Sequence, residues 1–190
     1  MSKIQVVGFD PSTSNWGICR ATVDIHTLDF TVDDLRLVQT ESEKNKGVRK
    51  DSDDLRRAQE VWAGMLLACT GASIAISEIP FMNPGSYASA NFNSGLVTGV
   101  LASCSIPLIQ VFPADVKFHA TGSRHAAKEE MIEWAMNKYP SAPWLLTKRK
   151  GAMVPTKANE HLADAVATIY AGLKTTQFQQ ATAMMKAMIA

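Results

Sequence analysis

The first forty residues consist of one continuous apolar run followed by segments in which apolar and polar positions alternate. The run KIQVVGF (residues 3–9) has the length and composition of a strand that is buried on both faces. Residues 16–40 alternate, are rich in β-branched side chains and are interrupted around residues 24–27. This pattern predicts two further strands that pair antiparallel and expose one face to solvent.

Helical and strand patterns take turns in the rest of the chain. Residues 55–69 carry apolar side chains at helical spacing, and residues 72–80 form a short apolar run that ends at Pro80. Further helices are predicted for residues 96–104, 126–139 and 160–174, and a further buried strand for residues 106–112. The segments with loop composition are 41–54, which is highly charged, 81–95, which is rich in turn residues, and 141–159, which is basic.

This order of elements predicts an α/β fold with a mixed five-stranded sheet and helices on both faces. The first three strands would form an antiparallel meander, and residues 72–78 and 106–112 would run parallel to the first strand through helical crossovers. The carboxyl ends of these parallel strands then share one rim, where open α/β sheets place their ligands. We expect a single domain over residues 1–174, with a helical or flexible tail over residues 175–190.

Length and composition narrow the class of protein. A chain of 190 residues with 46% hydrophobic and 19% charged residues is expected to be a soluble globular domain with a sizeable core. The three cysteines form no C-x-x-C pair, which indicates a reducing compartment and no zinc site. The N-terminus lacks an apolar signal core, so we expect a cytoplasmic protein. The apolar stretch 61–76 is interrupted by Gly, Thr and Ser, which favours a helix end followed by a strand over a membrane span.

The charges are unevenly distributed although the net charge is only +1. Residues 1–112 hold 9 Lys and Arg against 12 Asp and Glu, whereas residues 113–157 hold 8 against 4. A basic segment on a nearly neutral protein suits a local phosphate-binding face. Ordinary solvated Lys and Arg side chains would produce the same count, so charge alone leaves both interpretations open.

Two acidic residues stand at the ends of predicted parallel strands. Asp10 ends the first strand and Glu78 ends the strand SIAISE, so their carboxylates are expected side by side at one rim. Two close carboxylates need a counter-charge to stay ionised, and hard oxygen ligands suit Mg²⁺ or Mn²⁺. The alternative is that each acid caps a helix or pairs with a local lysine.

The last predicted helix adds a histidine and a third acid. Its core stripe is expected at Leu162, Val166, Ile169 and Leu173, which follow helical spacing. His161 and Asp164 lie one turn apart on another side, where small residues would allow close approach to a metal or a phosphodiester. A solvated helix start with a surface acid remains the alternative at this point.

Taken in order, the segments GFDPSTSNWG, ISEIPF, PADVKFHATGSRHAAKEEM and HLADAVA resemble the RuvC-type Holliday junction resolvases, a branch of the ribonuclease H-like nucleases. The likeness covers residues 4–174, and it departs from the family at Ser12, where a glycine is usual. The resemblance implies a ribonuclease H-like fold. It also implies a metal-dependent endonuclease that resolves four-way DNA junctions by paired nicks, leaving 5′-phosphate and 3′-hydroxyl ends.

The resemblance further implies the residues of the site. Asp10, Glu78, His161 and Asp164 would be the catalytic and metal-binding set, holding two Mg²⁺ ions about 4 Å apart, which Mn²⁺ can replace. Phe81 would stack on bases near the junction. The residues expected to bind DNA phosphates are Lys117, Arg124, Lys128, Lys148, Arg149 and Lys150.

Symmetric cutting of branched DNA implies a two-fold homodimer, and the small-residue helix 92–104 is its expected surface. The basic loop and the tail would suit a protein from a bacteriophage or a mobile element. One alternative keeps the fold and broadens the substrate to flaps, forks, three-way junctions or structured RNA. Another is a catalytically inert nucleic-acid-binding module. An actin-like ATPase or sugar kinase is disfavoured because those folds need a second comparable domain.

Overall fold

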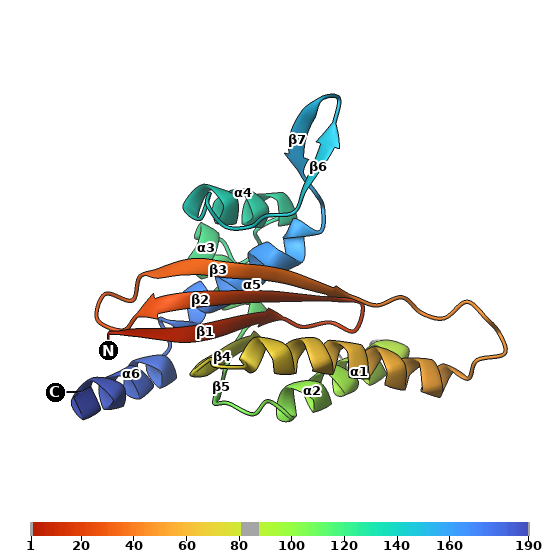
Figure 1. Cartoon of the computed structure of the whole chain (residues 1–190), viewed down its shortest axis with the longest axis horizontal. Helices are drawn as coiled ribbons and strands as arrows, with labels where there is room; N and C mark the ends of the chain where they lie inside the picture. Colours follow the sequence, from red (N-terminus) through yellow and green to blue (C-terminus); the bar gives the residue numbers. More distant parts are fainter. Residues whose placement is uncertain (1, 81–87, 190) are drawn as a thin grey trace.

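Five strands form one mixed sheet in the order β3-β2-β1-β4-β5 (Figure 1). The computed structural model describes residues 2–80 and 88–189. β1 pairs antiparallel with β2 and parallel with β4, β2 pairs antiparallel with β3, and β4 pairs parallel with β5. The predicted meander and the predicted parallel half of the sheet are both confirmed. The strands are β1 (Lys3–Asp10), β2 (Asn15–Asp24), β3 (Phe30–Gln39), β4 (Ile74–Glu78) and β5 (Leu108–Val111).

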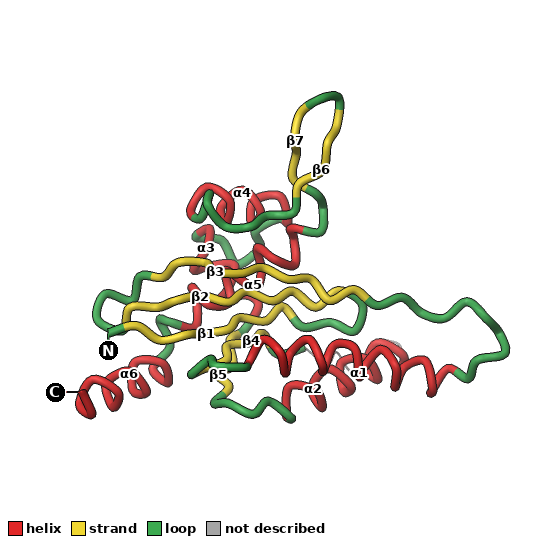
Figure 2. Tube along the Cα trace, in the orientation of Figure 1, coloured by secondary structure: helices red, strands yellow, loops and turns green. Residues whose placement is uncertain are grey.

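Helices cover both faces of this sheet, which separates two hydrophobic cores (Figure 2). α1 (Lys50–Cys69) and α2 (Ala88–Ala102) cover one face, and α3 (Pro113–Thr121), α4 (Lys128–Lys138) and α5 (Asn159–Gly172) cover the other. The tail forms α6 (Thr176–Ile189), which packs the fully buried Phe178 against the α5 core. In the described part of the chain, no helix is both long and apolar enough to cross a membrane.

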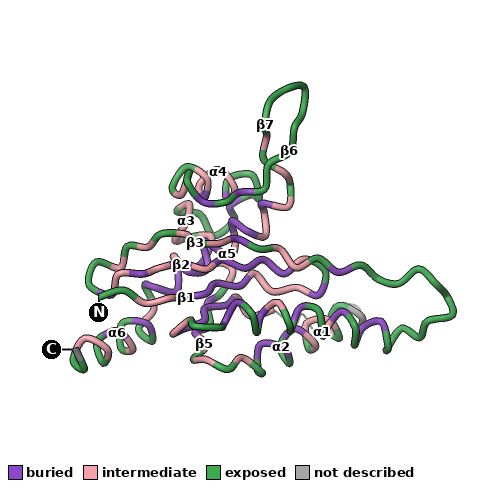
Figure 3. Tube along the Cα trace, in the orientation of Figure 1, coloured by how far each residue is buried: buried purple, intermediate pink, exposed green. Residues whose placement is uncertain are grey.

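The continuous apolar run of β1 follows from burial on both faces (Figure 3). Successive side chains of a strand point to opposite faces. Val7 and Phe9 accordingly belong to the core beneath α1 and α2, whereas Val6 belongs to the core beneath α5. All three side chains are fully buried. β1 is thus held rigidly from both sides up to the residue before Asp10.

Two glycines bring α5 against the sheet. A Cβ at Gly8 would lie 2.4 Å from the carbonyl oxygen of Ala165, and one at Gly17 would lie 2.1 Å from that of His161. Only a residue without a side chain therefore permits the observed spacing between these strands and the helix. The first turn of α5 consequently rests directly on the end of β2 that adjoins Asp10.

Two helices begin earlier than predicted, and one helix was not predicted. α2 begins at Ala88, within the segment 81–95 that has turn composition. α1 begins at Lys50, within the segment expected to be a loop. α3 was not expected, although Pro113 in its first turn and the left-handed Gly122 after its end are helix signals.

The prediction that the basic segment 141–159 is a loop is wrong, because this segment contains a β-hairpin. β6 (Leu146–Arg149) and β7 (Ala152–Pro155) pair antiparallel and project away from the body of the molecule (Figure 1). Lys150 and Gly151 form the turn with φ angles of 48° and 86°. Turns with two positive φ angles favour Asn-Gly or Asp-Gly, so the Lys-Gly pair conceals the hairpin in the sequence.

Candidate active site

Asp10 and Glu78 end adjacent parallel strands and point to the same side of the sheet. In β4, Ile74 and Ile76 face the α5 core, and the two-residue period of a strand places Glu78 on that side too. The same period places Asp10 on the side of Val6 and Gly8, which α5 covers. The two carboxylates predicted to share a rim thus also share a face with α5.

α5 brings His161 against Asp10. The Nδ1 atom of His161 lies 2.7 Å from Oδ2 of Asp10, at hydrogen-bond distance. The side chains of His161 and Asp10 are 25% and 18% exposed, so solvent and ligands can reach both. The hydrogen bond to Asp10 raises the pKa of His161 against the opposing effect of burial, and nearby acids add to the rise. This contact joins the start of α5 to the end of β1.

Glu78 and Asp164 lie within the electrostatic field of Asp10. Burial raises the pKa of Glu78 to about 8, and the charges of Asp10 and Asp164 contribute to that rise. Burial likewise raises the pKa of Asp164 to about 7, with contributions from Asp10 and Glu160. The positive charge of Lys117 of α3 opposes both rises. The cluster therefore concentrates more negative charge than its own cations balance.

The donor atoms fit a hard divalent cation, because carboxylate oxygens are the ligands that Mg²⁺ and Mn²⁺ prefer. A bound cation would also offset the repulsion between these acids, which adds to the effect of burial in raising the pKa values of Glu78 and Asp164. Among residues 2–80 and 88–189, no three His, Cys, Asp or Glu side chains already converge at metal-binding distances. For this set of residues to hold a cation, side-chain adjustment, water or substrate would have to complete the ligand positions.

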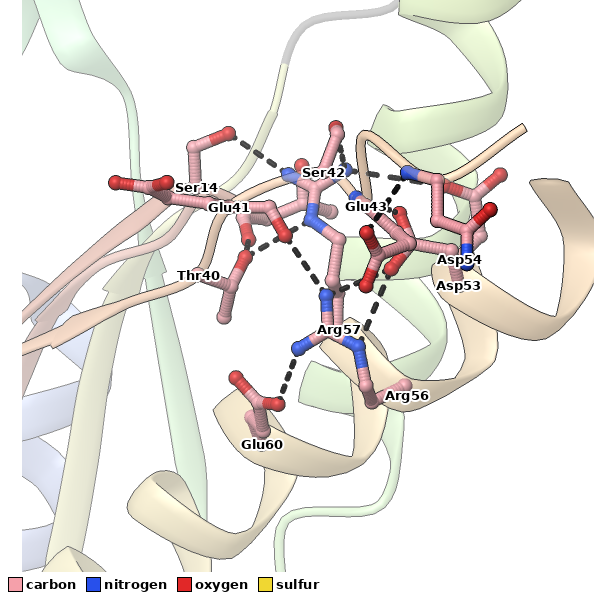
Figure 4. A network of polar contacts seen from close by, with 12 residues as sticks. Ser14, Thr40, Glu41, Ser42, Glu43, Asp53, Asp54, Arg56, Arg57 and Glu60 are labelled. Atoms are coloured by element: carbon pink, nitrogen blue, oxygen red, sulfur yellow. Dashed lines mark hydrogen bonds and ion pairs between the residues drawn. The ribbon is translucent and has the colours of Figure 1, made fainter. Parts of the chain in front are cut away.

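A buried arginine supports the turn that follows Asp10 (Figure 4). Arg57 of α1 is only 7% exposed and donates from Nε to Oγ1 of Thr40 and from Nη2 to Oγ of Ser14, at 2.9 and 2.8 Å. Thr40 in turn donates from Oγ1 to the carbonyl oxygen of Thr13. Arg57 thus connects α1 and the end of β3 to residues 13 and 14, only a few positions beyond the catalytic candidate.

The sequence analysis did not single out Arg57 or Gly17. Arg57 lies in a helix with other charged residues, and nothing in the local pattern distinguishes a buried arginine from a solvated one. Gly17 had a usable signal, because an isolated glycine inside a strand pattern often marks close approach of another backbone. Both residues matter through contacts between segments far apart in sequence.

The remaining predicted residues occupy several places around the rim. Lys128 begins α4 and its Nζ contacts a carboxylate oxygen of Glu160, next to His161. Arg124 pairs with Asp115 at 3.2 Å and lies 5.7 Å from the ring centroid of Phe118. The basic triplet Lys148, Arg149 and Lys150 forms the tip of the hairpin. Phe81 lies outside the described residues.

Known proteins provide an independent comparison with this geometry. No protein-family model matches the chain. The crossover junction endodeoxyribonuclease RuvC of Synechococcus sp. (strain CC9605) is 25% identical over 137 residues, which span 71% of this chain and 83% of that protein.

Solved structures of Thermus thermophilus RuvC share the fold. One, in complex with a Holliday junction substrate, superimposes with a TM-score of 0.64 at 19% identity, covering 94% of this chain and 97% of that one. A second gives a TM-score of 0.57 at 20% identity and covers 88% and 92% of the two chains. The predicted ribonuclease H-like fold is therefore confirmed. In its sequence and its fold together, this chain is similar to the RuvC-type Holliday junction resolvases.

Proposed function

We propose that the protein is a structure-selective endonuclease that resolves four-way DNA junctions by paired, symmetric nicks. The observation that carries this proposal is the 2.7 Å contact between His161 of α5 and Asp10, together with the charge interactions that link Asp10 to Glu78 and Asp164. The fold shared with T. thermophilus RuvC and the sequence similarity to Synechococcus RuvC support the choice of branched DNA as the substrate class. Hydrolysis would leave a 5′-phosphate and a 3′-hydroxyl at each cut.

Asp10, Glu78, Asp164 and His161 would hold two Mg²⁺ ions, or Mn²⁺ in their place. When bound, these ions supply Lewis acidity toward the phosphate oxygens and lower the pKa of a water molecule. The protein's own part is to fix the ligands rigidly. β1 is buried on both faces up to Phe9, and α5 is seated on Gly8 and Gly17, so neither the Asp10 carboxylate nor the His161 ring is carried by a flexible loop.

His161 would control protons and orientation beside Asp10. Its Nδ1 is used in the hydrogen bond to Asp10, so Nε2 is the nitrogen that would accept a proton from an attacking water. A pKa above the ordinary histidine value, caused by that hydrogen bond, makes the ring a stronger base. The alternative role for His161, direct metal ligation, would use the same ring position.

Basic side chains around the rim would bind DNA backbone without reading its sequence. Lys117 already lies within electrostatic reach of Glu78 and Asp164, so it suits the scissile phosphate or its neighbour. Lys128 and Arg124 would bind flanking phosphates and keep their ion pairs with Glu160 and Asp115. Phe81 would contact bases near the branch point, a role that stays a proposal from the sequence alone.

Paired cutting requires two active sites, and an apolar groove between α1 and α2 is the proposed dimer surface. The groove has a volume of about 310 Å³ and its lining includes Trp62, Leu96 and Val100. Trp62 is 42% exposed and Phe92, on the same helix pair, is 53% exposed. Burial of these side chains against a second copy would remove an apolar surface from water. Trp62→Glu should convert the dimer to a monomer in light-scattering measurements, and a retained dimer would exclude this surface.

The test of the proposed activity is incubation with a labelled four-way junction, with and without Mg²⁺, followed by mapping of both cuts. We expect metal-dependent nicks at symmetry-related positions in two strands. Asp10→Asn should abolish cutting yet retain junction binding, since it removes a charge and a metal ligand but few contacts with DNA. Parallel assays on flap, fork, three-way, linear and structured RNA substrates would identify a broader nuclease. Full cutting by Asp10→Asn would refute the site assignment.

A further inference from the structure

The β6–β7 hairpin has a regular, preformed geometry at its tip. Its cross-strand pairs run from Leu146 with Pro155 to Arg149 with Ala152, and the two-residue turn follows directly. Lys150, in that turn, has a φ angle of 48°, a conformation that Asn, Asp or Gly adopts at lower cost than lysine. Lysine therefore occupies the tip of the hairpin at a conformational cost.

The base of the hairpin is fixed to the helix that carries His161. Asn159, the first residue of α5, is fully buried. Its side chain accepts a hydrogen bond from the backbone N–H of Leu145 and donates one to the carbonyl oxygen of Leu145, both at 2.9 Å. The backbone N–H of Thr156 donates to the same carbonyl at 2.9 Å, which closes the base. The direction of the hairpin is therefore set relative to the candidate active site.

The tip does not contribute to the folded core. Seven of the eight strand residues are exposed, and Leu146 and Met153 are 48% and 60% exposed. Figure 3 shows the hairpin as an exposed projection beyond α4. A projection with apolar and basic side chains in water, held at a rigid base, is better suited to contact with another molecule than to stabilising this one.

The arrangement of charge on the hairpin matches a double-stranded nucleic acid. Between residues 144 and 158 there are four Lys or Arg residues and no acid. Lys148 and Arg149 are consecutive strand residues, so they project from opposite faces of the two-stranded ribbon, and Lys150 occupies the tip. The major groove of B-DNA is about 12 Å wide, admits a two-stranded ribbon and is walled by phosphates on both sides. Cations on both faces of one ribbon suit those two walls.

We propose that the β6–β7 hairpin enters the major groove of one arm of bound DNA, with Lys148 and Arg149 directed toward opposite phosphate backbones and Lys150 leading. The contact would be made to a duplex arm away from the site of cleavage and would not depend on base sequence. The choice of a branched substrate rests on the proposed function, whereas the contact with a duplex arm rests on the hairpin itself.

The test compares the wild type with two variants by fluorescence anisotropy on a labelled four-way junction in EDTA. The triple variant Lys148→Gln, Arg149→Gln, Lys150→Asn should bind about 10- to 100-fold more weakly at ~0.1 M salt, and its log–log salt slope should be shallower by about 2 to 3. Lys150→Asn alone should lower the slope by about 1 without lowering thermal stability, because Asn accepts the positive φ angle. Lys3→Asn, at the far end of β1, is the matched control and should bind like the wild type.

Methylation protection of guanine N7 locates the contact in the major groove. Wild type should protect guanines in one arm, and the triple variant should lose that protection. An unchanged affinity and slope in both variants, retained protection in the triple variant, or absence of DNA binding by the wild type would overturn the hairpin inference. A wild type that binds and protects an arm but never cuts a junction would refute the proposed function and leave the hairpin inference standing.

Discussion

The contact between Gly17 and His161 allows a direct test of how the fold positions the site. In Gly17→Ala, the new Cβ would lie 2.1 Å from the His161 carbonyl oxygen and 2.7 Å from its carbonyl carbon. Ordinary contacts of this kind begin at 3.4 Å, so β2 and α5 must separate by about 1.3 Å. Because both partners are backbone, no side-chain rotation can relieve the overlap.

The expected cost has a structural and a catalytic part. Overpacking of this kind destabilises a protein by up to about 3 kcal/mol, which for a chain of this length lowers the melting temperature by roughly 6–12 °C. A shift of about 1 Å at His161 would also lengthen its 2.7 Å contact with Asp10. Misplacement on that scale costs on the order of 100-fold in rate. The nicking rate should therefore fall by about that factor at temperatures where the variant is fully folded.

Gly64→Ala is the matched control, because its Cβ would lie 2.5 Å from Cγ2 of Val38, on the face of the sheet opposite to α5 and His161. It should lower stability by about 1–2 kcal/mol, partly offset by the better helix propensity of alanine, and keep the nicking rate. Thermal unfolding and junction cleavage should be measured on both variants. The positioning role of Gly17 is wrong if Gly17→Ala loses stability yet cuts at the rate of Gly64→Ala, or if it matches the wild type in both measurements.

Three further predictions concern other parts of the fold. Without metal, burial raises the pKa of Glu78 from 4.5 to about 8, so the folded protein binds a proton more tightly than the unfolded chain does. The free energy of unfolding should therefore fall as pH rises from about 5 to 8.5. Glu78→Gln should flatten this decline in urea titrations with EDTA. An equal decline in Glu78→Gln would contradict that assignment. Arg57→Gln should lose about 2–3 kcal/mol of stability and cut more slowly, because Ser14 and Thr40 lose a buried donor; a wild-type urea midpoint and rate would show that the turn needs no such support. The sulfur atoms of Cys69 and Cys104 lie 3.7 Å apart, so oxidised glutathione should join them by disulfide exchange, seen as a mass loss of two hydrogens that Cys69→Ser prevents.

Much of the fold was predictable because its strands have strong local patterns. The continuous apolar run of β1 and the alternation of β2 and β3 follow from burial on two faces and on one face respectively. The parallel placement of β4 and β5 follows from the helical segments between the strands, which act as crossovers. The sequence by itself thus determined the sheet and placed Asp10 and Glu78 at one rim.

The tertiary structure decided how α5 meets that rim. Helical spacing shows that His161 and Asp164 share a side of a helix, but not that His161 reaches Asp10, because their contact joins residues 151 positions apart. That approach depends on two glycines whose missing side chains matter only once β1, β2 and α5 are packed together. The raised pKa values of Glu78 and Asp164 likewise arise from burial and from neighbours on other elements.

The hairpin and the start of α2 were decided at the same level. Lys150 and Gly151 are not a typical hairpin pair, and the strands beside them become visible only through their cross-strand hydrogen bonds and the clamp at Asn159. The first turns of α2 have turn-like composition and precede the core residues Val97 and Leu101 of the same helix. Local sequence determines structure where one residue's propensity or period is strong. Elsewhere long-range packing determines the structure, because its free energy exceeds the differences in local conformational preference, which are on the order of 0.5 kcal/mol per residue.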